Sequence, residues 1–247
     1  MANGCRDDTA VQAGSVAGVR VIEIGAASKI VALNTGDAVA TAFPRAYIDA
    51  DVAVTADDLR ALAGVLSASS EARAAAPRMR VDSSASTWPV RAYYRVWELS
   101  DFRGDGHIGS GVYAVNERGR ERWGDFPDVI ADDRFVQQRF AASERTTLHD
   151  ATFSVRASRD MSTHVRRGVR IEQGNRELRD DLQRAGQISA PTRYGRLLGR
   201  VLVRPGRWLD LPCYVYGFGM AKLRARRRSG APVVWSRDDS LREEARV

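Results

Sequence analysis

One stretch decides the fold class of this 247-residue chain: Pro44-Arg45-Ala46-Tyr47-Ile48-Asp49-Ala50-Asp51-Val52. Its short apolar run, 46–48, predicts a buried strand, and Asp49 and Asp51 follow that strand directly. In open α/β folds, ligands bind at the rim formed by the carboxyl ends of the strands. Two carboxylates at such a rim suit Mg²⁺ or Mn²⁺, and an ion of this kind suits a diphosphate. The alternative for an isolated Asp-x-Asp is ordinary turn chemistry after a strand.

The segments around this stretch alternate between predicted helices and strands. Upstream, the pattern predicts a short helix at 6–17, a strand at 19–24 and a helix at 28–42. Downstream, Thr55 is a good N-cap for a helix with Asp57 and Asp58 in its first turn. This alternation is typical of an α/β fold with a mainly parallel sheet and crossover helices.

Further along, the elements are separated by polar loops. We expect a helix at 88–99, a strand at 112–115, a helix opened by Asp132-Asp133 and a strand at 147–155. From Met161 the sequence is arginine-rich and predicts a helix.

Composition and charge narrow the class of protein. The net charge is +7 and the pI is near 9.9, which favours partners that carry phosphate. Two cysteines, Cys5 and Cys213, do not make a disulfide framework and fit a reducing cytosol. No stretch reaches the roughly 18–20 apolar residues of a spanning helix, and the polar N-terminus shows no signal peptide.

Two more groups could carry chemistry. Asp132 and Asp133 follow the apolar run 129–131; they are either simple helix-start residues or include a general base. Arg166 and Arg167, with Arg170 one turn on, could grip phosphates or simply form a solvated face.

Taken in order, these motifs resemble the family 2 glycosyltransferases, which have the GT-A fold. The residues that carry the resemblance are Lys29-x-x-Ala32-Leu33-Asn34-x-Gly36, Asp49-Ala50-Asp51, Gly109-Ser110-Gly111, Ala131-Asp132-Asp133 and the pair Arg166-Arg167. The resemblance implies a GT-A-like mixed sheet flanked by helices, and inverting transfer of a sugar from a nucleotide-diphosphate donor to an acceptor hydroxyl.

The resemblance also implies roles for individual residues. Asp49 and Asp51 would bind Mn²⁺ or Mg²⁺, with Asp51 the more direct ligand. The implied catalytic residues are Asp133, which would be the base, and Asp132 beside it. The implied donor-binding residues are Asn3, Asp7, Lys29, Asn34, Asp49, Gly109, Ser110, Gly111, Arg166 and Arg167.

The start of the chain, Asn3-Gly4-Cys5-Arg6-Asp7-Asp8-Thr9, resembles the loop that follows the family's second strand. We therefore expect the family's first strand and helix to be missing, which would leave an exposed strand edge. The expected organisation is a transferase domain at 1–187, a helical, basic appendage at 188–235 and a charged tail at 236–247.

The appendage has two readings. Aromatic residues from Trp208 to Tyr216, followed by a basic cluster, suit either an interfacial helix on anionic lipid or a helix packed on the catalytic domain. The expected partners are a nucleotide-sugar donor and a carbohydrate or lipid-linked acceptor, without nucleic acid. The expected location is the cytoplasm, including the inner face of the membrane. Rival hypotheses are a catalytically inactive transferase remnant, a nucleic-acid-binding protein and a nucleotidyltransferase.

Overall fold

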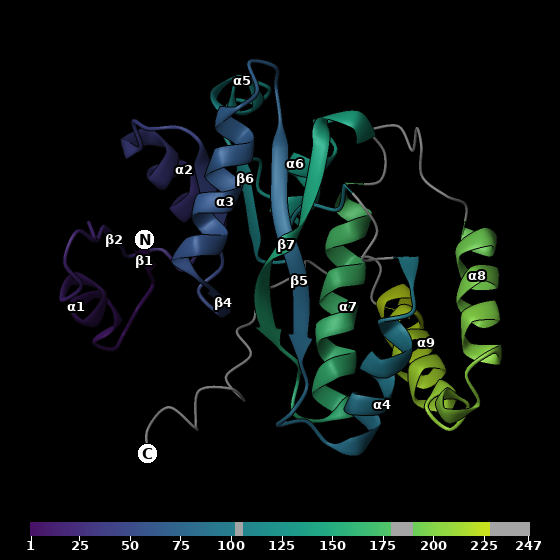
Figure 1. The fold of residues 1–247 in the computed structure, drawn as a ribbon. Coiled ribbons are helices and arrows are strands. Elements are labelled where there is room, and N and C mark those ends of the chain that lie inside the picture. The colour runs from purple at the N-terminus through teal and green to yellow at the C-terminus, as the bar shows by residue number, and fades with distance from the viewer. Residues whose placement is uncertain (102–105, 179–189, 228–247) are drawn as a thin grey trace.

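The computed structural model describes residues 1–101, 106–178 and 190–227, which form an α/β fold with a mixed sheet (Figure 1). The strands are β1 (Ala2–Asn3), β2 (Glu23–Ile24), β3 (Arg45–Ile48), β4 (Val52–Val54), β5 (Ala74–Asp82), β6 (Val112–Val115) and β7 (Arg145–Arg156). The α-helices are α1 (Thr9–Gly14), α2 (Lys29–Val39), α3 (Ala56–Ser67), α4 (Trp88–Trp97), α5 (Glu117–Arg120), α6 (Asp132–Gln137), α7 (Met161–Glu177), α8 (Ala190–Leu202) and α9 (Leu211–Arg227).

The strands form two sheets. Five strands pair in the order β3-β6-β5-β7-β4, while β1 and β2 form a separate parallel pair. Within the described residues, β3 has no strand on its outer side and forms one edge of the large sheet. The expectation of a mainly parallel sheet is wrong, because only β5 and β7 pair in parallel in the large sheet. Alternating helices and strands do not by themselves fix the direction of each strand.

The large sheet is strongly curled. β3 and β4 lie at its two edges, yet only residues 49–51 connect them. Four Cα–Cα steps reach about 15 Å, whereas four interstrand spacings in a flat sheet need about 19 Å. The register shift between Pro77 and Arg78 lets the β5–β7 pair bend, and Figure 1 shows β7 crossing β5 on its way to β4. The Asp-x-Asp segment is the link that joins the two edges.

β5 was not expected from the sequence. It begins with three alanines and a proline, which have low strand propensity. Those alanines are almost fully buried because helices and aromatic side chains cover both faces of the strand. Tertiary packing therefore overrides local preference here.

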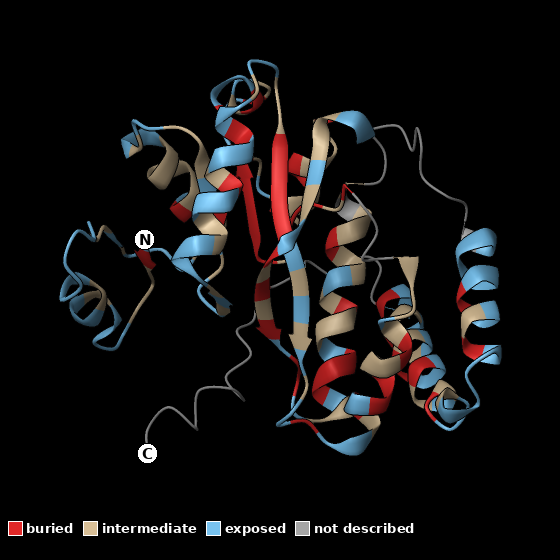
Figure 2. Cartoon of the chain, in the orientation of Figure 1, coloured by how far each residue is buried: buried red, intermediate tan, exposed pale blue. Residues whose placement is uncertain are grey.

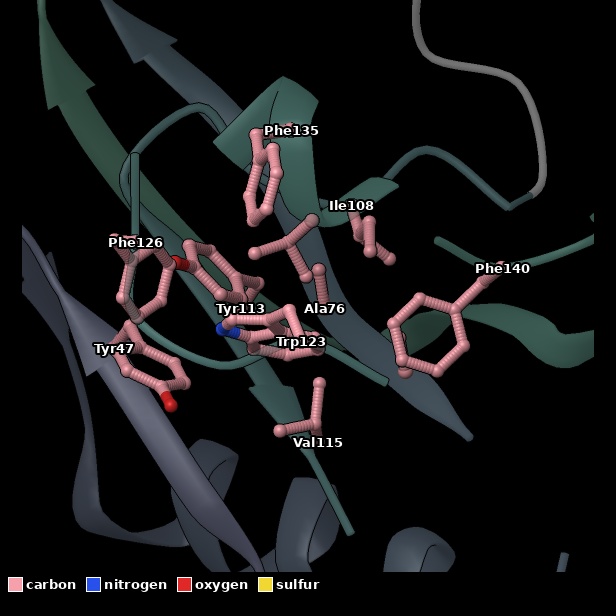
Figure 3. Close-up of a cluster of buried hydrophobic side chains, with 11 residues drawn as sticks. Tyr47, Ala76, Ile108, Tyr113, Val115, Trp123, Phe126, Phe135 and Phe140 are labelled. Atoms are coloured by element: carbon pink, nitrogen blue, oxygen red, sulfur yellow. The ribbon is translucent and has the colours of Figure 1, made fainter. Parts of the chain in front are cut away.

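An aromatic core packs against β3, β6 and α6 (Figure 3). Tyr47 of β3 stacks on Tyr113 of β6 with ring centroids 4.9 Å apart, and Phe126 meets Tyr47 edge-on. Trp123 and Phe135 complete the cluster around Phe126. This packing fixes the relative positions of β3, β6 and α6.

The C-terminal helices pack on the rest of the chain. α9 lies against α7 and α4, and α8 contributes Leu197 and Val201 to the same cluster. Figure 2 shows that most of α8 is nevertheless exposed. Across the described ranges, we find no helix with the length and apolar character needed to cross a membrane. The expected tail at 236–247 lies outside the described residues.

Candidate functional site

The ends of four elements meet beside the aromatic core. Lys29 is the first residue of α2, Asp49 follows β3, and Asp132 is the first residue of α6. The segment 109–111 leads into β6, which pairs with β3. Because β3 and β6 are antiparallel, the backbone N–H of Asp49 donates to the Gly111 carbonyl over 2.8 Å. Residues that are far apart in the sequence therefore share one rim of the sheet.

Lys29 joins two of the predicted carboxylates. Its Nζ lies 2.7 Å from Asp49 Oδ1 and 2.8 Å from Asp132 Oδ1. Burial by itself would lower the pKa of Lys29, but the charges of Asp132 and Asp49 outweigh it and hold this pKa above its ordinary value. The ammonium thus remains charged at neutral pH and acts as a bridge between β3 and α6.

The two adjacent aspartates have different environments. Asp132 is 2% exposed, and burial raises its pKa to about 6, against the opposing effect of Lys29. Asp133 is only partly buried; its Oδ2 accepts from the backbone N–H of Ser110 and its Oδ1 from that of Arg134, both over 2.7 Å. Only Asp133 of this pair is placed where a substrate could reach its carboxylate.

The segment 109–111 needs its glycines. Gly109, Ser110 and Gly111 have φ values of 108°, 61° and 121°, a left-handed run that favours glycine. A Cβ on Gly109 would lie 2.6 Å from Cβ of Asp133, and one on Gly111 would lie 2.6 Å from Cγ1 of Val52. The glycines therefore let this segment approach α6 on one side and the segment after β3 on the other.

A buried ion-pair network fixes the elements that carry Lys29 and Asp49. Asp37 of α2 accepts from Arg45 of β3 over 2.5 Å, from the hydroxyl of Tyr47 over 2.8 Å and from Arg120 of α5 over 3.0 Å. Burial, followed by the charge of Asp37, raises the pKa of Tyr47, so this hydroxyl is a stable donor. No local pattern in the sequence predicts this network.

Of the two residues expected from the N-terminal loop, Asn3 lies near the start of α2. Gly4 packs against Ala27, so that Asn3 lies close to the segment that carries Lys29. Asp7 accepts from the backbone N–H and the hydroxyl of Thr9, the first residue of α1.

Asn34 was expected to bind a donor, but its side chain is engaged in the fold. Its Oδ1 accepts from the backbone N–H of Phe126 over 2.8 Å, and its Nδ2 donates to the carbonyl of the same residue over 3.2 Å. Asn34 thus attaches α2 to the loop that supplies Phe126 to the aromatic core.

The structure does not bring Arg166 and Arg167 to the acidic cluster. Arg166 donates to Ser162 and Thr163 on its own helix, and Arg167 donates to the carbonyl of Arg156. Gly174, which lies against Ile130 and the start of α6, is seven residues further along α7, or about 10 Å at 1.5 Å per residue.

Two histidines have defined surroundings in the structure. His164 is buried against Tyr93 and Tyr94, and burial lowers its pKa to about 4. The Nε2 of His107 lies 3.0 Å from Ser110 Oγ. In the sequence, the three-residue spacing of His107 and Ser110 across Gly109 is the one pattern that could indicate this contact.

The carboxylates at this rim are possible ligands for a divalent ion. Among the described residues, no group of three His, Cys, Asp or Glu side chains could hold a metal unaided. Mg²⁺, however, is commonly bound by one or two carboxylates together with substrate phosphates. The carboxylate of Asp51 is exposed and has no hydrogen bond or ion pair in the described structure. Of the two carboxylate oxygens of Asp49, Lys29 contacts Oδ1 and leaves Oδ2 available to an ion. One lysine beside three carboxylates also leaves excess negative charge, so the site fits a metal shared with a diphosphate.

Comparisons with protein-family models, with curated proteins and with solved structures found no match for this chain.

Proposed function

We propose that this chain is an inverting, metal-dependent glycosyltransferase with a GT-A-like fold, which takes a nucleoside-diphosphate sugar as donor. One observation carries the proposal: Lys29, Asp49, Asp132 and Asp133 meet at one rim of an α/β sheet. The N-terminus of α2 adds its positive dipole beside Lys29, a combination that suits a phosphate-bearing ligand.

The acidic residues have separate roles in the proposed reaction. Asp49 and Asp51 would hold Mn²⁺ or Mg²⁺, which offsets the charge that grows on the departing nucleoside diphosphate. Asp132, buried and bound to Lys29, positions the start of α6 and is not itself the base. This separation refines the expectation that both aspartates are catalytic.

Asp133 is the proposed general base. Its carboxylate is held by two backbone N–H groups and stays partly exposed. It accepts the proton of the acceptor hydroxyl as that oxygen bonds to the anomeric carbon, while the bond from this carbon to the diphosphate oxygen breaks. The acceptor is a carbohydrate or a lipid-linked hydroxyl compound. The two backbone donors orient the carboxylate before the acceptor arrives.

The test combines donor binding with turnover. Thermal-shift screening of UDP- and GDP-sugars with Mn²⁺ identifies a donor, and release of the nucleoside diphosphate then measures turnover. Asp133→Asn should abolish turnover and spare donor binding, whereas Asp51→Ala should weaken metal-dependent donor binding.

Asp57→Asn is the matched control, because Asp57 is an exposed carboxylate whose ion-pair partner is Arg60 on the same helix. Full turnover by Asp133→Asn would show that the base is misassigned. Metal-dependent binding of a donor with no turnover in any variant would favour the inactive remnant. No binding of any sugar nucleotide would overturn the proposal.

A further inference from the structure

The helical hairpin of α8 and α9, residues 190–227, is fixed to the body of the protein by one face. Tyr214 of α9 stacks on Tyr93 of α4 with centroids 5.2 Å apart. Gly217 lies so close to Tyr93 that an added Cβ would be 2.9 Å from its ring, and Gly168 of α7 faces Ala221 in the same way. The hairpin is thus a packed part of the structure, and its outward face is held in a defined orientation.

The outward face has an apolar corner where α8 turns into α9. We define this corner by Leu198, Leu202, Val203, Trp208 and Leu209. Leu209 is 80% exposed, Val203 74% and Trp208 54%. The indole Nε1 of Trp208 donates to the Leu202 carbonyl over 3.3 Å, which holds the ring against the end of α8. Exposed apolar side chains that are grouped in this way are typical of an interaction surface.

The charge of the protein is concentrated in the same hairpin. Residues 190–227 contain eight arginines and one lysine but a single acidic residue, Asp210, a net charge of +8. Since the whole chain carries +7, all the other residues together carry −1. The excess positive charge therefore lies in the hairpin that has the apolar corner.

Several of these arginines flank the corner and extend into solvent. Arg204 is exposed, and its guanidinium donates to the carbonyl of Arg200 one turn earlier. Arg200 and Arg207 are ion-paired with Asp101 and Asp210 but keep 42% and 38% of their side chains exposed. At the far end of α9, Arg224 and Arg227 are also exposed.

We propose that the apolar corner and the surrounding arginines form a docking surface for an anionic lipid bilayer. A tryptophan and branched aliphatic side chains at a helix corner can enter the headgroup region, while arginines bind lipid phosphates around them. Charge complementarity favours this partner, because the net charge of +8 on the hairpin is attracted to the anionic headgroups of such a bilayer. The docked protein lies on one leaflet, and both helices remain outside the hydrocarbon core.

The experiment is co-sedimentation of the full chain with vesicles. Vesicles of phosphatidylcholine mixed equally with phosphatidylglycerol should bind the protein, and phosphatidylcholine alone should not. Added salt should release it, because the arginine contribution is screened. The double variant Trp208→Ser/Leu209→Ser should reduce the partition coefficient at least about tenfold. Arg204→Gln/Arg227→Gln should reduce both binding and its dependence on salt.

Val11→Ser/Val16→Ser is the matched control, because these valines of the N-terminal region are 75% and 56% exposed but lie outside the basic hairpin. Equal binding to both kinds of vesicle, or unchanged binding by the Trp208/Leu209 variant, would overturn the proposal. So would a dimer in sedimentation velocity that this variant abolishes, combined with no vesicle binding. The assay contains no nucleotide sugar, so its result is independent of the proposed transferase activity.

Discussion

The ammonium of Lys29 lies 2.8 Å from the carboxylate of Asp132, and through this contact the first residues of α2 and α6 face each other. Asp132 is almost completely buried, so it depends on Lys29 for charge compensation. The same ammonium reaches Asp49 at the end of β3. The fold of the rim and its electrostatics therefore depend on one side chain.

Removing this lysine should destabilise the protein. We expect Lys29→Met to lower the free energy of unfolding by about 2–3 kcal/mol, since it leaves a buried carboxylate without its partner. Lys29→Met/Asp132→Asn should recover part of that loss in a double-mutant cycle measured by urea unfolding. Arg60→Met, which breaks an exposed pair with Asp57, should change stability by less than about 0.5 kcal/mol. Additive effects in the cycle would show that Lys29 and Asp132 are not coupled.

The glycine before Ser110 should not tolerate a side chain. Gly109→Ala would place a Cβ 2.6 Å from Cβ of Asp133 at a φ of 108°. We therefore expect this variant to lower the free energy of unfolding by about 1–3 kcal/mol. Gly64→Ala is the control, because Gly64 is an exposed glycine in α3 with open space around its Cα. That variant should gain about 0.5–1 kcal/mol. Thermal unfolding measures both, and equal effects would contradict the structure around Gly109.

Asn34 can be separated from donor binding experimentally. Asn34→Ala leaves the N–H and carbonyl of Phe126 without their partners, so we expect a loss of about 2 kcal/mol in the free energy of unfolding. Thr35→Ala removes only a hydrogen bond to Val31 on the same helix and should have a smaller effect. If Asn34→Ala kept its stability but lost donor affinity in a binding titration, Asn34 would contact the donor.

His164 should make stability depend on pH. Its pKa is lowered to about 4 in the folded protein, first by burial and then by the charge of Arg167, and lies near 6.5 when unfolded. Between these values His164 binds more protons in the unfolded chain, so its contribution to stability is fully present above pH 6.5 and is lost as the pH drops toward 4. The slope of this contribution approaches about 1.4 kcal/mol per pH unit. Urea unfolding across this range should show a weaker slope for His164→Phe, and an unchanged slope would exclude His164 as its source.

The sequence predicts part of this fold because some signals are local. The apolar runs at 46–48 and 112–115 form the strands β3 and β6, although the expectation that the first strand is buried is wrong, because only Tyr47 of β3 is buried. Thr55 caps α3 through a capping box with Asp58, as the residue types indicate. β5 was missed because its alanines and Pro77 resemble a loop until the layers above and below them are known.

The candidate site was predictable in its residue types and not in its contacts. Asp49 and Asp133 lie at the ends of elements, where turn and cap chemistry leaves a visible pattern. The bridge from Lys29 to Asp49 and Asp132 depends on which strands pair, and this information is not local. For the same reason no local pattern shows that α4 covers His164 with two tyrosines.

The three-residue connection at 49–51 has a consequence for the order of events during synthesis. β4 does not pair with β3, its neighbour in the chain; its partner is β7, with Val52 opposite Val155. On the ribosome, Asp51 is therefore translated long before the strand that holds the adjoining β4 in place. β4 can join the sheet only after β7 has emerged from the exit tunnel, and a nascent chain that stops earlier lacks this pairing.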